Sequence, residues 1–237
     1  MKIIEFDLEK GSYEFELSGI ETASHAHPAI EMVWSKNGGI TIETTNKLVE
    51  NIAFAIIGAN IIHRIAAPKE NVQVLMIECH PTFLKKISSQ FDMELKEGIY
   101  TETNKTDRAA LIKECFILGR NHKTLPTTNL RIQTCVNYLN STVADYKEMI
   151  PILKSKVHLS ESRLSHLFKE EMGLSIKKYL VWSRLKKAFE LVINRKLNMY
   201  EAALQVGFYD QAHLSKAFKQ MLGLNPSKVY NSIMLQE

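Results

Sequence analysis

A twelve-residue pattern occurs twice in this chain, and it constrains the fold more than any other feature of the sequence. Residues 164–175 read LSHLFKEEMGLS and residues 214–225 read LSKAFKQMLGLN, with six of the twelve positions identical. Both copies space apolar residues three and four apart, as one face of an α-helix does. A glycine near the end of each copy is typical of a helix terminus. We therefore expect two copies of one helical unit.

Helical periodicity continues across the whole C-terminal half of the chain. Preferred N-cap residues precede several of the expected helices, and glycines follow several of them. Each copy of the repeat is then the second helix of a helix-turn-helix, the motif that places its second helix in the major groove of DNA. The expected helices are Leu130–Ser141, Ile150–Val157, Glu161–Met172, Ile176–Asn194, Met199–Val206 and Gln211–Leu222.

The two repeat helices each separate an apolar stripe from a polar face. The stripe of the first helix consists of Leu164, Leu167, Phe168 and Met172, and that of the second consists of Leu214, Ala217, Phe218 and Met221. The opposite faces carry small polar and cationic side chains, which suit base edges and phosphates. The predicted DNA-binding residues are Ser162, Arg163, Ser165, His166, Lys169, Gln211, Ala212, Ser215, Lys216 and Lys219.

Charge is distributed unevenly between the two halves. Residues 1–125 hold 14 Lys and Arg against 17 Asp and Glu, a net charge of −3, whereas residues 126–237 hold 16 against 9, a net charge of +7. A basic C-terminal half indicates an anionic partner, with nucleic acid first among the candidates. A solvated, lysine-rich helical surface is the alternative explanation of the charge alone.

The second repeat unit resembles the signature of AraC/XylS-type bacterial transcription regulators. Residues 199–219 read MYEAALQVGFYDQAHLSKAFK, residues 223–226 read GLNP, and Arg184 and Ala188 also match the pattern. The resemblance covers roughly residues 129–231. It implies that the two repeat helices read successive major-groove segments on one face of double-stranded DNA, at a separation fixed by the long central helix. It also implies a small-molecule effector, and RNA polymerase as a partner if the protein is an activator. Separately, two amphipathic helical stretches beside a small barrel predict a homodimer through the barrel and residues 81–121.

Three residues depart from that pattern. Lys154 and His158 stand in the first unit where many members have a small residue and a glycine, and Asn231 stands where arginine is frequent. A lysine at a packing position must extend its amino group toward solvent. Histidine tolerates a left-handed turn better than most side chains.

The N-terminal third has the pattern of an antiparallel β structure. Short β-branched and aromatic stretches are separated by turn signals at Gly11-Ser12, Asn37-Gly38-Gly39 and Pro68, and two helical stretches follow. The expected strands are Ile3–Leu8, Tyr13–Leu17, Ile30–Trp34, Ile40–Thr44, Ala53–Ile57, Ile61–Ile65 and Val72–Ile77, and the helices are Pro81–Phe91 and Thr106–Gly119.

The predicted fold is therefore α+β with two domains. A cupin-like β-barrel or sandwich, which we expect to act as the sensor, spans residues 1–80. A helical dimerisation or linker region spans 81–125, with the linker centred on residues 125–128. An all-α DNA-binding domain spans 126–237, with two helix-turn-helix units joined by a long helix.

Histidines in the N-terminal domain match the first cupin-barrel motif. The spacing is Gly19-x5-His25-x-His27-x3-Glu31-x6-Gly38, and His63 follows in a weaker second half. His25, His27, Glu31 and His63 could line an effector pocket or form a nitrogen and oxygen site for a transition metal. Core or pocket histidines without metal are the favoured interpretation, so no cofactor is expected.

Composition excludes several other classes of protein. At 45% hydrophobic residues the chain can form a globular core, and no apolar run reaches membrane-spanning length. Acidic residues near the N-terminus argue against a signal peptide, and three scattered cysteines fit a reducing cytoplasm. We predict a transcription regulator and not an enzyme. The enzyme alternative is a metal-dependent cupin isomerase or dioxygenase, which leaves the repeat unexplained.

Overall fold

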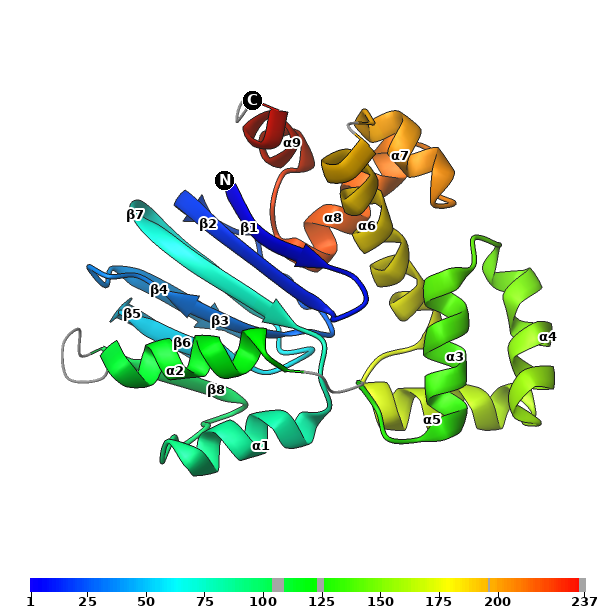
Figure 1. The fold of residues 1–237 in the computed structure, drawn as a ribbon, viewed down its shortest axis with the longest axis horizontal. Coiled ribbons are helices and arrows are strands. Elements are labelled where there is room, and N and C mark those ends of the chain that lie inside the picture. Colours follow the sequence, from blue (N-terminus) through cyan, green and yellow to red (C-terminus); the bar gives the residue numbers. More distant parts are fainter. Residues whose placement is uncertain (104–108, 123–125, 196, 235–237) are drawn as a thin grey trace. The chain divides into compact units, whose positions relative to one another are not determined.

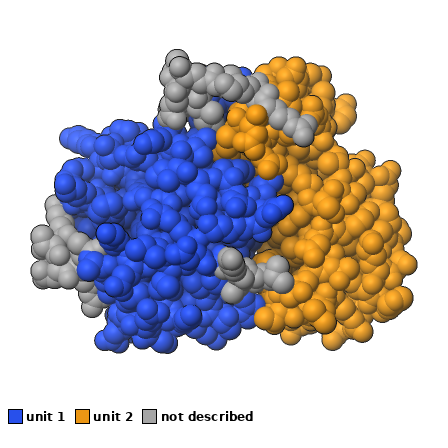
Figure 2. Space-filling view, in the orientation of Figure 1, with its two compact units in different colours: residues 1–124, 219–237 blue, residues 125–218 orange. Residues whose placement is uncertain are grey.

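The computed structural model describes residues 1–103, 109–122, 126–195 and 197–234. Its contacts group into two compact units: residues 1–124 together with 219–237, and residues 125–218 (Figure 2). The first unit is built on an antiparallel sheet and the second is entirely helical, which confirms the predicted fold class. The expected linker begins at Leu125, which lies outside the described residues.

Eight strands form the sheet of the first unit (Figure 1), and their order is β1-β2-β7-β3-β6-β8, with β4 joining β7 and β5 joining β4. Ile30–Trp34 and Ile40–Thr44 have the predicted bounds, whereas β5 and β8 were not predicted. The strands are β1 Lys2–Asp7, β2 Ser12–Glu21, β3 Ile30–Trp34, β4 Ile40–Thr44, β5 Leu48–Ile52, β6 Phe54–Ile57, β7 His63–Ile77 and β8 Ile99–Glu102.

Strand β7 is one continuous strand where the sequence predicts two. Pro68 was interpreted as a turn between them, which is wrong. Ala67 pairs with Ile20 and Asn71 pairs with Ser18, so residues 68–70 lie opposite Gly19 alone. Proline has no backbone N–H, but a bulge of this kind needs none from it. The strand therefore passes through Pro68 without losing a ladder hydrogen bond.

Helices α1 (Pro81–Gln90) and α2 (Ala109–Arg120) pack against the sheet (Figure 1). Phe83 and Ile87 of α1 and Cys115 and Phe116 of α2 belong to the same buried cluster as the sheet residue Phe54. The expected start of α2 at Thr106 lies outside the described residues. The apolar faces of both helices are thus used within the unit.

An ion pair fixes the end of α2 on the sheet. The guanidinium of Arg120 donates two hydrogen bonds of 2.6 Å to the carboxylate of Glu14 in β2, and Gln73 in β7 donates another. Glu14 is fully buried, so its charge is acceptable only because it is paired and hydrogen-bonded.

The helices of the C-terminal half closely follow the predicted series. One additional helix, at residues 226–234, groups with the first unit, as does the end of the helix before it. No helix in the described part of the chain is long and apolar enough to cross a membrane. The helices are α3 Leu130–Ser141, α4 Tyr146–Val157, α5 Glu161–Met172, α6 Ile176–Arg195, α7 Met199–Gln205, α8 Gln211–Leu222 and α9 Pro226–Met234.

Helix α4 begins four residues earlier than the sequence predicts. Asp145 and Glu148 form a capping box that fixes the start at Tyr146, and this places Pro151 inside the helix. The sequence predicts the helix to begin at Ile150, one residue before this proline. The cap therefore decides the boundary at this helix.

Candidate nucleic-acid interface and buried histidine cluster

The predicted DNA-binding residues lie on the outer faces of α5 and α8. The apolar stripes point inward: Leu164 and Phe168 of α5 and Leu214 of α8 have at most 1% of their surface exposed. All of the predicted residues are exposed except Ser215, which is half-buried. Each helix thus packs on its apolar stripe and exposes its polar face to solvent. A helix that reads DNA in a groove needs this arrangement, because its polar side chains must reach bases and phosphates.

The turn between α4 and α5 depends on a left-handed residue. His158 has φ 53° and ψ 48°, and it ends α4 in the position where the sequence pattern has glycine in many regulators. The Ser160 side chain then accepts a hydrogen bond from the Arg163 backbone N–H at 3.3 Å and caps α5. The prediction that histidine would occupy a left-handed turn here agrees with the backbone. Lys154 is half-buried one turn earlier.

The turn between α7 and α8 depends on glycine. Gly207 has φ +85°, and a Cβ at this position would lie 3.1 Å from the guanidinium of Arg184. Asp210 caps α8, since its carboxylate accepts a hydrogen bond from the His213 N–H at 2.7 Å. Gln211 therefore begins α8 directly after its cap, with its side chain exposed.

Arg184 in the middle of α6 joins the two helix-turn-helix units. Its guanidinium donates one hydrogen bond of 2.6 Å to the carbonyl of Gly207, in the second turn, and another of 2.6 Å to the carbonyl of Ala144, just before α4. The side chain is 11% exposed, and burial lowers its pKa. One residue earlier in α6, the Ser183 hydroxyl donates to the Leu139 carbonyl at 3.1 Å. The sequence identifies Arg184 only through the family resemblance. Its hydrogen-bond partners are main-chain carbonyls, which every residue type has, so no pattern of side chains predicts these contacts.

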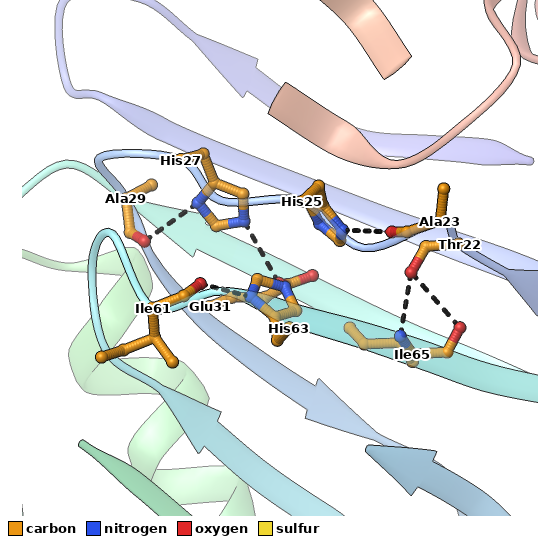
Figure 3. A network of polar contacts seen from close by, with 9 residues as sticks. All are labelled: Thr22, Ala23, His25, His27, Ala29, Glu31, Ile61, His63 and Ile65. Carbon is orange, nitrogen blue, oxygen red and sulfur yellow. Dashed lines mark hydrogen bonds and ion pairs between the residues drawn. The ribbon is translucent and has the colours of Figure 1, made fainter. Parts of the chain in front are cut away.

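Four side chains, three from residues 25–31 and one from residue 63, meet inside the first unit (Figure 3). His25 and His27 lie between β2 and β3, Glu31 lies in β3, and His63 begins β7. Their exposed fractions are 5%, 2%, 4% and 1%. One potential ligand atom from each lies within 4.8 Å of all the others. The structure therefore brings together the whole predicted set.

The backbone holds these four residues in place. His25 and His63 lie opposite each other and exchange two backbone hydrogen bonds of 2.9 Å, and the Asn60 N–H donates to the His27 carbonyl at 2.8 Å. Glu31 lies in the ladder between β6 and β7. The cluster is thus built on paired backbone and not on a mobile loop tip.

Each imidazole has one nitrogen against a main-chain carbonyl (Figure 3). The Nδ1 atoms of His25, His27 and His63 lie 2.9, 3.0 and 2.9 Å from the carbonyl oxygens of Ala23, Ala29 and Ile61. On the inner side, Oε2 of Glu31 lies 3.3 Å from Nε2 of His27 and 2.9 Å from Nε2 of His63.

Burial and the shared carboxylate shift the pKa values of the cluster in opposite directions. Burial lowers the pKa of His25 to about 3, and the neighbouring His63 adds to the effect. Burial also opposes the charged forms of Glu31 and His63. For Glu31 the hydrogen bonds with His27 and His63 outweigh it and hold the pKa below its ordinary value, and for His63 the contact with Glu31 raises the pKa above its ordinary value. Without another cation, the cluster holds a His63–Glu31 ion pair beside a neutral His25.

The apolar residues that surround Glu31 in the sequence are packed in the core. Ala29, Ile30, Met32 and Val33 have at most 2% of their surface exposed. A hollow of about 250 Å³ lies elsewhere, against β8, and is lined by Lys47, Glu94, Lys96, Ile99, Tyr100 and Thr101. An effector pocket at the histidines stays a prediction.

Comparison with known proteins supports the helix-turn-helix interpretation. The family described as "Helix-turn-helix domain" matches residues 153–232. The Msm operon regulatory protein of Streptococcus mutans is 34% identical over 125 residues, covering 53% of this chain and 44% of that protein. The arabinose operon regulatory protein of Escherichia coli is 31% identical over 136 residues, covering 56% and 45%. This chain thus matches a little under half the length of these relatives.

A solved structure has the fold of nearly the whole chain. ToxT from Vibrio cholerae superposes with a TM-score of 0.59 and covers 93% of this chain and 97% of its own, at 13% sequence identity. At that identity the likeness concerns the fold alone, and it extends the agreement from the helical half to the sheet.

Proposed function

We propose, on the premise that residues 153–232 match the helix-turn-helix family, that the protein is an AraC-type, sequence-specific, double-stranded-DNA-binding transcription regulator of the bacterial cytoplasm. The observation that carries the proposal is the pair of exposed polar helix faces, α5 and α8, in two helix-turn-helix units connected by α6. The enzyme alternative receives no support from the relatives, which are regulators by name.

The dimensions of the connecting helix support simultaneous binding of both units. Helix α6 has 20 residues, which corresponds to about 30 Å. Successive major-groove segments on one face of DNA are about 34 Å apart. The net charge of +7 on residues 126–237 favours a polyanion of this kind.

Positions along each helix divide the residues into two roles. Ser162, Ser165 and His166 of α5, with Gln211, Ser215 and Lys216 of α8, are assigned to base edges because they lie in the first two turns. Lys169 and Lys219 lie further along and are assigned to phosphates. Arg163 and Ala212 are the remaining predicted residues on these two helix faces, and neither role is assigned to them. Gln211 is the strongest assignment, since its amide can pair bidentately with adenine.

Selection of bound sequences from random DNA by the full-length protein tests the proposal. A defined motif with two segments about one helical turn apart is the expected result. Gln211→Ala should weaken binding to that motif by about 1–3 kcal/mol and relax one base pair. Gln220→Ala is the matched control, because Gln220 is exposed on the same helix but nine residues away, on the opposite face.

Three outcomes are informative in that experiment. An unchanged motif with Gln211→Ala removes Gln211 from the base readers. A lower melting temperature without a change of motif assigns Gln211 to capping beside Asp210. Salt-sensitive binding without any preferred sequence overturns sequence-specific regulation in favour of an architectural role.

Homodimerisation and effector sensing through the first unit complete the proposal, with RNA polymerase as a partner if the protein activates transcription. Since α1 and α2 use their apolar faces on their own sheet, a dimer would use their outer surface, where Ile117 is 41% exposed. Pairing raises the effective concentration of the second DNA-binding module. Sedimentation showing a monomer at tens of micromolar would contradict the dimer.

A further inference from the structure

We propose that His25, His27, Glu31 and His63 bind one divalent transition-metal ion, with zinc as the best-fitting candidate. The site lies within the sheet unit, and its test requires no DNA. The sequence alone favours histidines without metal, because it cannot show whether the four ligand atoms converge. The structure shows that they do, inside the described part of the sheet unit.

Orientation of the imidazoles is the first argument. A carbonyl oxygen accepts hydrogen bonds only, so each Nδ1 that lies against Ala23, Ala29 or Ile61 carries the proton. In the neutral ring this leaves the lone pair on Nε2. Main-chain carbonyls that fix ligand histidines in this way are the usual outer shell of protein metal sites.

The inner contacts then require a positive charge. Two Nε2 atoms, those of His27 and His63, lie 3.3 and 2.9 Å from the same carboxylate oxygen of Glu31. Nitrogen lone pairs facing a carboxylate oxygen repel each other unless a proton or a metal ion lies between them. Since the four side chains are almost completely buried, water cannot screen that repulsion.

The distances between the ligand atoms fit a bound metal ion. Nitrogen and oxygen ligands of tetrahedral zinc lie about 2.0–2.2 Å from the ion, and therefore about 3.3–3.5 Å from one another. The 3.3 Å and 2.9 Å contacts are close to that spacing. The longest separation of 4.8 Å must shorten on binding, which small rotations of the imidazoles can provide. Three imidazoles and a carboxylate also suit zinc, nickel, cobalt or iron(II).

The arrangement is that of a closed site. Four protein ligands fill a tetrahedral shell, whereas catalytic zinc keeps a position open for water or substrate. No ligand is more than 5% exposed. The ion would therefore stabilise or regulate the sheet unit and would not perform catalysis there.

Zinc titration of the full-length, metal-stripped protein in competition with a chromophoric chelator tests the site. One equivalent per chain is expected, together with a higher melting temperature of the sheet unit. Glu31→Gln keeps the size and hydrogen bonding of the side chain but removes the ligand charge, and it should lower zinc affinity at least about tenfold, as should His27→Gln. His213→Gln, an exposed histidine on α8, is the control and should bind like the unchanged protein.

Cobalt(II) gives a second measurement that needs no variant. The visible d–d bands of a tetrahedral nitrogen and oxygen site should appear at one equivalent, and X-ray absorption should show imidazole scattering without sulfur. A protein that takes up no zinc against the chelator, or one whose affinity is the same with Glu31→Gln as without it, overturns the proposal. Sulfur ligation of the cobalt would overturn it equally, because the described cluster contains no cysteine.

Discussion

Replacing Arg184 by alanine should destabilise the helical unit more than any substitution on its surface. The change removes two hydrogen bonds of 2.6 Å from a cation to the carbonyls of Gly207 and Ala144. Hydrogen bonds to a charged group contribute about 1.5–3 kcal/mol each, or about 3–6 kcal/mol together. Part of this loss is offset, because Nε of the buried guanidinium has no hydrogen-bond partner within the described structure. Removing that unsatisfied group stabilises the variant by about 1–2 kcal/mol. The expected loss in the free energy of unfolding is therefore about 1–5 kcal/mol.

Tryptophan fluorescence can isolate this unit in the full-length protein. The chain has two tryptophans, Trp34 in the sheet and Trp182 in α6. In a Trp34→Phe background, urea unfolding followed by fluorescence reports only on the surroundings of Trp182, which is 2% exposed. Unfolding of the two units need not be a single transition, so this local signal is required.

Two further variants test whether the two hydrogen bonds of Arg184 account for the loss of stability. Arg184→Lys should lose an intermediate amount, because one ammonium group cannot reproduce the planar fork that reaches both carbonyls. Arg131→Ala removes an exposed arginine from α3 and should change the free energy of unfolding by less than about 0.5 kcal/mol. If Arg184→Ala is as mild as Arg131→Ala, water satisfies the two carbonyls and Arg184 does not join the units.

Three other predictions address separate features. Lys219→Ala should weaken binding to every DNA sequence alike and reduce the slope of log affinity against log salt by about one, measured by titration at several salt concentrations; a sequence-dependent loss would contradict a phosphate contact. His158→Gly should raise the free energy of unfolding by up to about 1 kcal/mol, because the left-handed backbone strains histidine but not glycine; a lower urea midpoint would show that the imidazole makes a stabilising contact. Burial raises the pKa of Cys79 and Cys115 to about 12 and that of Cys135 to about 11, so all three should resist iodoacetamide at pH 8 until urea unfolds the chain; rapid alkylation of the native protein would refute this.

Sequence signals fix the helices of the second unit because those signals are local. Ser160 and Gly173 delimit α5 within a few residues of chain, and the structure uses both as caps. Strand β8 has no comparable signal. It is four residues long, and it is a strand because it pairs with β6, which lies more than forty residues earlier in the chain. Pairing partners at that distance leave no local pattern to interpret.

The buried cluster shows a similar division. Spacing alone identified His25, His27, Glu31 and His63 as a set, since histidines one residue apart share a direction on extended chain. It could not show which nitrogen of each ring faces inward. That orientation depends on main-chain carbonyls such as those of Ala23 and Ile61, and every residue type supplies such a carbonyl.

Strand β7 limits how this protein can change in length during evolution. His63–Ala66 pair with β4, and Val72–Ile77 pair with β2, so both ends of one strand carry core residues in a fixed register. An inserted residue within either end would turn every following side chain to the opposite face. Only residues 68–70, at the bulge opposite Gly19, can absorb such a change. Insertions and deletions among descendants of this chain should therefore gather at Pro68–Glu70, and the histidine cluster should be lost by substitution and not by changes in length.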